Sequence, residues 1–134
     1  MSGGVHWNAK EESCHIGKNA IHRIVDLESI PFVADMIYQD ATSDIVAELA
    51  GEFGSHHLDP ASLDLLLSFH SFLVRTDKHT ILVDLCCGND KDRPTRQAWH
   101  KRSGPFLDNL AKTGVQPSDI DFVMCTHLHA DHVG

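Results

Sequence analysis

The segment that most constrains this chain is Thr126 to Gly134, which reads Thr-His-Leu-His-Ala-Asp-His-Val-Gly. Four side chains that can bind a metal ion fall within six residues: His127, His129, Asp131 and His132. The apolar run before it, from Ile120 to Met124, predicts a buried strand. Residues two apart in extended chain point to the same side, so His127 and His129 can bind one ion together. If the chain then turns, Asp131 and His132 can face a second ion.

The donor types in this segment indicate which metals fit. Imidazole nitrogen and carboxylate oxygen suit Zn²⁺, and manganese, iron or cobalt are further candidates. A single His at the end of a strand is ordinarily a surface or core residue, and this chain has 11 His. An ordered H-x-H-x-D-H directly after an apolar strand is much harder to obtain by chance. The segment therefore predicts a metal site.

This loop resembles the signature loop of the metallo-β-lactamase-fold hydrolases. Upstream segments resemble the paired strands, glycine loop, connecting helix and next strand of that superfamily: 71–76, 79–84, 86–89, 103–115 and 117–121. Within the superfamily, the chain looks most like the branch of N-acyl-homoserine lactonases and methyl-parathion-hydrolase-like enzymes. The likeness covers about residues 18 to 134, and the signature loop is its highly specific part.

The resemblance implies an α/β fold, the N-terminal half of an αββα sandwich with the metals at one edge of the sheets. It implies a dinuclear metallo-hydrolase that uses a metal-bridging hydroxide on a lactone, ester or phosphotriester. His127 and His129 would bind the first ion, and Asp131 and His132 the second, with Asp131 also orienting the nucleophile. In the family a later His completes each ion and a later Asp bridges both. We therefore expect an N-terminal part of a longer enzyme, inactive by itself.

Asp84 ends a second apolar run, Ile81 to Val83, which has no polar alternation and predicts a strand buried on both faces. A carboxylate at the end of a buried strand needs partners, because an unpaired buried charge is costly. By resemblance, Asp84 matches the aspartate that supports the metal loop by accepting the free N–H of a ligating imidazole. The alternative is a carboxylate that caps the turn at Gly88.

Other functions remain open at this point. A glyoxalase-type thioesterase carries the same loop, and a non-catalytic fragment could keep half of the fold without turnover. Diiron flavoproteins share the fold, but their loop usually carries Glu where this chain has His129. The residues 56 and 57 are both His, yet adjacent side chains usually point apart, so we expect them in an exposed loop.

The net charge and the apolar segments of the chain indicate what it binds and where it is located. The chain has 11 Lys and Arg against 19 Asp and Glu, a net charge of −8, which argues against a nucleic-acid partner. The resemblance implies a small-molecule substrate. No apolar stretch is long enough to span a membrane, and the first residues lack the pattern of a signal peptide, so a cytoplasmic location is expected. Self-association into a homo-oligomer is compatible with these features.

The four cysteines are not spaced like a zinc-finger set and are expected to be free thiols. Of these, Cys125 is expected to be a small buried strand residue.

The pattern along the chain predicts a loose N-terminal arm over residues 1–17. Residues 18–134 then form part of one domain that stops just after the metal loop. Strands are expected at 19–27, 63–75 and 80–85, with the last two forming a hairpin around Asp77-Lys78. Helices are expected from Ser43 or Asp44 to Phe53, ended by Gly54, and around 106–111, ended by Gly114.

Overall fold

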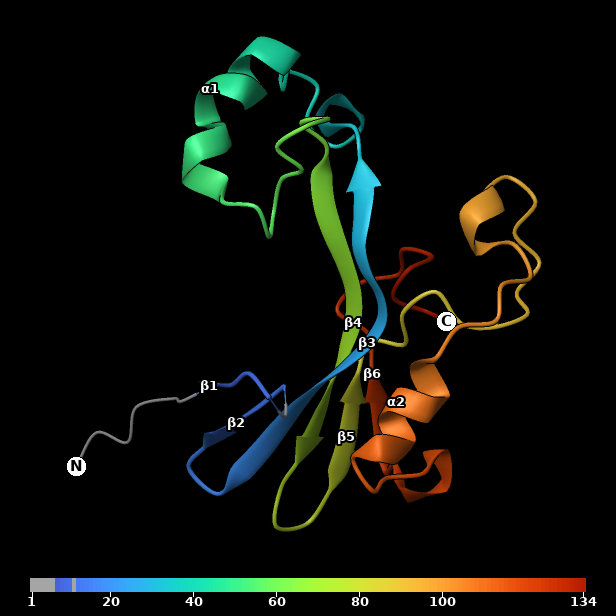
Figure 1. The fold of residues 1–134 in the computed structure, drawn as a ribbon. Helices are drawn as coiled ribbons and strands as arrows, with labels where there is room; N and C mark the ends of the chain where they lie inside the picture. Colours follow the sequence, from blue (N-terminus) through green and yellow to red (C-terminus); the bar gives the residue numbers. More distant parts are fainter. Residues whose placement is uncertain (1–6, 11) are drawn as a thin grey trace. The chain divides into compact units, whose positions relative to one another are not determined.

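The computed structural model describes residues 7–10 and 12–134 (Figure 1). Its strands form one six-stranded sheet in the order β1-β2-β3-β4-β5-β6, accompanied by two α-helices, so the predicted α/β class is confirmed. The chain divides into two compact units: unit 1 comprises residues 1–26 and 69–134, and unit 2 comprises residues 27–68. Strands β3 (Asn19–Phe32) and β4 (Leu65–Arg75) contribute residues to both units. Each unit is described by itself below.

The start of unit 1 is more ordered than the sequence predicts. Strand β2 (Ser13–Ile16) pairs antiparallel with both β1 (Trp7–Asn8) and β3, and two of its residues are buried, so the prediction of a loose arm is wrong there. Gly17, at a φ of +62°, makes the tight turn that places Ile16 opposite Asn19. This short polar segment has too few apolar residues to show a period, but a glycine in a two-residue turn was the available signal. Residues 1–6 and 11 of the predicted arm lie outside the described residues, and the domain boundary at residue 18 stays a prediction.

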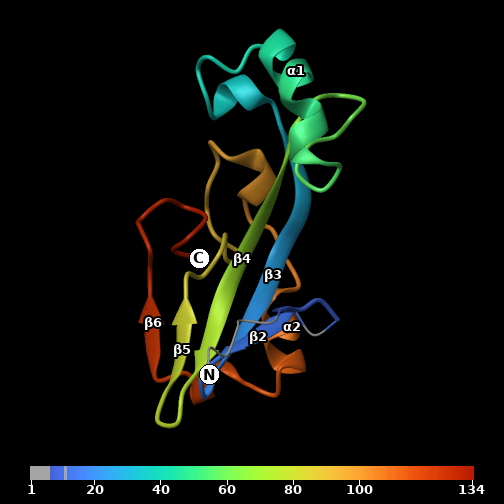
Figure 2. The same cartoon turned by 90° about the vertical axis from the view of Figure 1, so that its left-hand side faces the viewer.

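The centre of unit 1 is the predicted hairpin. Strand β4 pairs antiparallel with β5 (Thr80–Val83), with Leu73 opposite Leu82. The turn is closed by the N–H of Thr76, which donates to the carbonyl of His79 over 2.9 Å. Strand β6 (Phe122–Met124) then lies parallel to β5 (Figure 2). Because β5 and β6 are parallel neighbours, the residues that follow them meet at the same edge of the sheet.

Helix α2 (Phe106–Lys112) supplies the main core of unit 1. Leu110, which is 1% exposed, packs with Leu73 and Leu82 of the sheet. Burying such a side chain stabilises a fold by about 1.5–3 kcal/mol. The rest of this core comes from β3, the loop after β5 and the residues around α2: Ile24, Cys86, Phe106 and Val115. The helix is followed by Gly114 at a φ of +80°, so its predicted end is confirmed.

Strand β6 is not buried, contrary to the prediction. Phe122, Val123 and Met124 are 53%, 51% and 57% exposed. The reason is its position: β6 is the last strand in the sheet order and has β5 as its neighbour on one side. In β5, Leu82 is buried but Ile81 and Val83 are half-buried, so burial on both faces is also incorrect. An apolar pattern identifies a strand, while its exposure depends on what packs against it.

Unit 2 contains helix α1 (Ser43–Phe53), which has the predicted bounds. The hydroxyl of Thr42 caps its first turn by accepting from the N–H of Ile45, and Gly54 follows it at a φ of +69°. A small core of Ala34, Val46 and Leu58 holds this unit together. His57 is exposed next to that core, as predicted for the His56-His57 loop.

The remaining elements are short 3-10 helices: η1 (Ala34–Met36), η2 (Gln97–Trp99) and η3 (Pro117–Asp119). Over residues 7–10 and 12–134, no helix is long and apolar enough to cross a membrane.

Candidate metal centre

The metal loop begins where β6 ends, and it folds back over the residues that follow β5. The N–H of Asp84 donates to the carbonyl of Met124 over 2.7 Å. The N–H of Leu85 donates to the carbonyl of His132 over 3.0 Å. The first bond continues the pairing of β5 with β6, and the second fixes the far end of the loop. The loop is therefore held at both ends by the backbone of the segment after β5.

The side chain of Asp84 is the polar centre of this arrangement. Its carboxylate accepts the backbone N–H of Thr126 over 2.7 Å and the hydroxyl of Thr126 over 2.9 Å. It also lies 2.9 Å from Nδ1 of His132. Asp84 is 8% exposed and has a φ of +64°, a left-handed conformation that Asp tolerates better than most residues. These contacts, rather than a turn at Gly88, satisfy the carboxylate.

The pKa of Asp84 reflects the same contacts. Burial acts to raise this pKa, but the hydrogen bonds from the Thr126 backbone, from His132 and from the Thr126 hydroxyl together outweigh it. The pKa therefore lies below its ordinary value, and the group is an ionised acceptor at neutral pH. An ionised Asp84 accepts hydrogen bonds and donates none.

The acceptor at Asp84 determines how the imidazoles are oriented. A proton on Nδ1 of His132 is directed to Asp84, which leaves the Nε2 lone pair of His132 pointing away. The Thr126 hydroxyl donates to Asp84 and so can accept a hydrogen bond from an N–H at Nδ1 of His127, 3.1 Å away. Nε2 of His127 is then also free. With protons on both Nδ1 atoms, the two rings would each present an unprotonated Nε2, the form that binds a metal.

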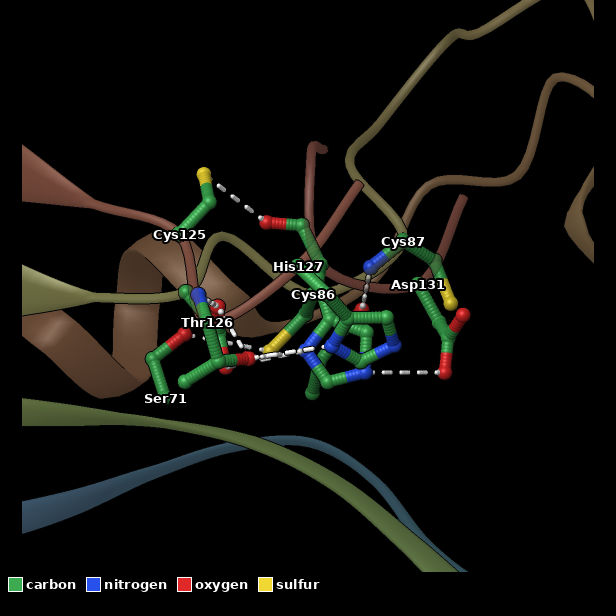
Figure 3. A network of polar contacts seen from close by, with 10 residues as sticks. Ser71, Cys86, Cys87, Cys125, Thr126, His127 and Asp131 are labelled. Atoms are coloured by element: carbon green, nitrogen blue, oxygen red, sulfur yellow. Dashed lines mark hydrogen bonds and ion pairs between the residues drawn. The ribbon is translucent and has the colours of Figure 1, made fainter. Parts of the chain in front are cut away.

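The predicted ligands lie close together. The ring centroid of His127 is 4.5 Å from that of His129 and 3.9 Å from that of His132. The carboxylate of Asp131 lies 3.3 Å from Nε2 of His132 (Figure 3). The loop thus brings together His127 with His129, and Asp131 with His132, the two pairs that were predicted. It also places His127 next to His132, which the spacing did not indicate.

This donor set fits a divalent transition metal chemically, because it offers neutral imidazole nitrogens and a carboxylate at a solvent-accessible sheet edge. In the part of the chain that the structure describes, no group of three or more His, Cys, Asp and Glu side chains is arranged to hold an ion. The four side chains therefore lie near one another, but their donor atoms do not surround a common position. Their roles as ligands, and that of Asp84 as their support, stay predictions.

A second set of residues, which the sequence did not single out, holds the segment 84–88 in place. Arg102 donates to both carboxylate oxygens of Asp26, over 2.7 and 2.8 Å, and the Asp26 side chain is 1% exposed. Asp26 also accepts the N–H of Cys87, whose carbonyl accepts from Arg93. The Cys87 backbone is thus held by Asp26, 61 positions away, and by Arg93, six positions away. No local pattern marks such a contact.

The cysteines at the centre differ in exposure. Burial raises the pKa of Cys86 to about 12, although its hydrogen bond with Ser71 acts in the opposite direction. Burial also raises the pKa of Cys87 to about 11. Both are therefore neutral thiols at physiological pH. Cys125 is exposed and donates its S–H to the carbonyl of His132, so the expectation that it is buried is wrong.

Two glycines make the backbone crossing at this site feasible. A Cβ atom on Gly88 would lie 2.5 Å from the carbonyl carbon of Gly134, and one on Gly134 would lie 2.4 Å from the nitrogen of Gly88. Gly88 also has a φ of +71°. The end of the metal loop therefore rests directly on the backbone of the loop after β5. A side chain at either position would separate the two.

Known proteins match this chain both in sequence and in structure. The family model described as the metallo-beta-lactamase superfamily matches residues 68–134, half of the chain. A curated relative, metallo-beta-lactamase domain-containing protein 1 of Xenopus laevis, is 40% identical over 55 residues, which are 41% of this chain and 18% of that protein. The chain spans less than a fifth of that relative's length.

Solved structures match over most of the chain. The hydrolase AbOPH of the beta lactamase superfamily matches with a TM-score of 0.66 and 22% identity, over 98% of this chain and 38% of its own. AidC, a dizinc quorum-quenching lactonase in complex with the product N-hexnoyl-L-homoserine, matches with a TM-score of 0.67 and 20% identity, over 96% and 37%. A probable metal-dependent hydrolase from Staphylococcus aureus matches with a TM-score of 0.66 and 20% identity, over 88% and 40%.

The likeness to these structures concerns the fold, and the family match covers the residues from the end of unit 2 through the metal loop. The same residues carry the hairpin, the Asp84 centre and the four gathered donors. Fold, sequence and local geometry thus agree, and the chain belongs to the metallo-β-lactamase superfamily.

Proposed function

We propose that this chain carries the metal-binding loop of a dinuclear metallo-hydrolase that acts on a lactone, ester or phosphotriester. The observation that carries the proposal is the orientation of His132, whose Nδ1 faces the Asp84 carboxylate at 2.9 Å while its Nε2 lies 3.3 Å from Asp131. A carboxylate that accepts the remote N–H of an imidazole is the usual support of a histidine that binds a metal. The substrate class rests on resemblance, including the matched lactonase AidC.

Each residue has a defined part in this proposal. His127 and His129 would hold one ion, and Asp131 and His132 the other, with zinc as the expected metal. Bound ions of this kind supply a nucleophile derived from water at neutral pH and polarise the substrate's reacting oxygen. Asp131 would also accept a hydrogen bond from a water molecule and so orient it. Asp84 and Thr126 keep the imidazoles in the tautomers that leave Nε2 free.

The experiment is metal analysis and hydrolysis by the protein expressed from its own gene. We expect close to two transition-metal ions per chain and hydrolysis of a lactone or ester that is lost on chelation and restored by Zn²⁺. An intact hydrolase that contains no metal would contradict the proposal. Faster hydrolysis of a glutathione thioester than of any lactone, ester or phosphotriester would replace it with the thioesterase function.

Matched variants test the ligands. His129→Ala should lower the bound metal by about one ion per chain, because an ion that keeps too few protein donors dissociates readily. His79→Ala serves as the control, since His79 is also exposed but lies in the β4–β5 turn, where its Nδ1 is 3.8 Å from the Asp121 carboxylate. Equal metal content in the two variants would exclude His129 as a ligand.

A further inference from the structure

Unit 2 contains a cavity that is lined by none of the residues of the candidate metal centre. It has a volume of about 590 Å³ and is formed within residues 27–68, by α1, the segment before it and the first residues of β4. Pockets for small molecules commonly have volumes of about 300–1,000 Å³. Its wall is mostly aliphatic, and includes Ala34, Ile45, Val46, Leu49, Leu65 and Leu67. The cavity therefore suits the apolar body of a small ligand.

Some residues of the cavity wall are buried, and others are accessible to solvent. Ala34 and Val46 are 5% and 6% exposed and belong to the core of unit 2. Ile45 and Leu49 are 44% and 38% exposed, although they lie on the same helix as Val46. Exposure of these apolar side chains to water is unfavourable. An apolar ligand that covered them would remove this cost.

The charge of the surrounding segment selects the polar part of a ligand. Residues 27–68 contain eight Asp and Glu and no Lys or Arg, so this segment carries the whole net charge of −8, and the rest of the chain is balanced. One of these acidic residues, Asp40, lines the cavity, together with Tyr38 and His57. A field of one sign around a cavity attracts ligands of the opposite charge and repels those of the same charge. Fatty acids and other anionic amphiphiles are therefore disfavoured.

We propose that this cavity binds a small amphipathic cation, with an alkyl or aryl body against the aliphatic wall and an ammonium group at Asp40 and Tyr38. An aromatic ring and a carboxylate are the groups that recognise an alkylated ammonium ion. The cavity shares no lining residue with the metal loop, and it would bind a different chemical group. Its test is therefore independent of the proposed hydrolase function.

The experiment compares two ligands of equal chain length and opposite charge, octyltrimethylammonium and octyl sulfate, below their micelle concentrations. Tyr38 is the single tyrosine of the chain, so incorporated 3-fluorotyrosine gives one ¹⁹F resonance that reports on this cavity. We expect saturable shifts of this resonance, with the cation binding about tenfold more tightly than the anion, a difference of about 1.4 kcal/mol. Added salt should reduce this preference because it screens exposed charges.

Variants locate the site. Leu49→Asn, at the mouth of the cavity, should weaken cation binding at least about fivefold, and Asp40→Asn should weaken it about threefold without weakening the anion. Ile16→Asn is the control, because Ile16 is 50% exposed on β2 of unit 1 and does not line the cavity. Circular dichroism verifies that each variant is folded. Equal affinity for the two ligands, a silent Tyr38 resonance, or full binding by Leu49→Asn would each overturn the proposal.

Discussion

The carboxylate of Asp84 lies 2.9 Å from Nδ1 of His132, a residue 48 positions further along the chain. This contact joins the end of β5 to the last predicted ligand of the metal loop. The Thr126 backbone and hydroxyl bind the same carboxylate, so one buried group fixes both the start and the end of the loop. Removing its charge should therefore act on metal retention more than on the fold.

Asp84→Asn is the direct test of this relationship. Asn also tolerates the left-handed conformation at φ +64° and keeps one oxygen acceptor, so the fold should persist. Loss of the carboxylate should weaken metal retention by about 10- to 100-fold, measured in a competition titration with a chelator. Asp121→Asn is the matched control, because Asp121 accepts the N–H of Thr80 at the start of β5, away from the loop. Equal metal affinity in the two variants would leave Asp84 with a structural role alone.

Because the loop after β5 touches the end of the metal loop at Gly88, Gly88→Ala should destabilise the protein more than Gly114→Ala. Gly114→Ala should lower the free energy of unfolding by about 1–2 kcal/mol, because Gly114 has a φ of +80° but no neighbouring atom within 4 Å of an added Cβ. Gly88→Ala carries a similar conformational cost and also places Cβ 2.5 Å from Gly134. The added overpacking should cost roughly 1–3 kcal/mol more, measured by urea denaturation. Similar values for both variants would show that the loops separate freely.

The cysteines should differ in their reactivity. At pH 8, iodoacetamide should modify the exposed Cys125 and spare Cys86 and Cys87, whose pKa values are raised to about 12 and about 11 by burial. Mass spectrometry of the digested protein measures this directly, with the urea-unfolded protein as the control in which every cysteine reacts. Modification of Cys86 at the rate of Cys125 would contradict the buried position of Cys86.

The raised pKa of Cys86 also predicts a loss of stability at high pH. The folded state keeps this thiol protonated, while the unfolded chain ionises it near the ordinary cysteine pKa of 9.0. Its contribution is therefore complete below about pH 9 and declines as the pH rises towards 12. The free energy of unfolding, measured across this range, should fall. Constant stability up to pH 12 would mean that Cys86 ionises equally in both states.

The exposed apolar strand predicts self-association of residues 1–134. Phe122, Val123 and Met124 are all more than half exposed on the last strand of the sheet, a surface that favours pairing with another chain. Sedimentation should show oligomers, and Val123→Lys should shift them towards monomer because an edge lysine opposes pairing. Leu107→Lys, at 53% exposure on α2, is the control. A monomer at every concentration would refute this prediction.

Residues 1–134 alone should bind zinc weakly and show negligible lactonase or phosphotriesterase turnover. The loop offers two donors to each of two ions, whereas a catalytic zinc site uses three protein ligands and a water. Zinc titration and an ester assay on the purified chain measure both properties. Normal turnover would mean that this chain completes its own site with donors outside the loop.

Much of this protein was predictable from local pattern. The H-x-H-x-D-H loop, the hairpin around Asp77-Lys78 and the bounds of α1 were each read from residues close together in sequence. Such features depend on turn chemistry, apolar period and the spacing of donors, all of which a short segment contains. The superfamily followed from the same loop, and the match over residues 68–134 confirms it.

The tertiary structure decided the contacts between distant residues and the exposure of each element. The Asp26–Arg102 ion pair spans 76 positions, and the approach of Gly88 to Gly134 depends on two loops that meet only because β5 and β6 are parallel neighbours. Strand β6 reads as buried in sequence, yet it is exposed because it has a neighbour on one side. Local patterns specify what each segment prefers, whereas burial and ion pairing depend on which segments the fold brings together.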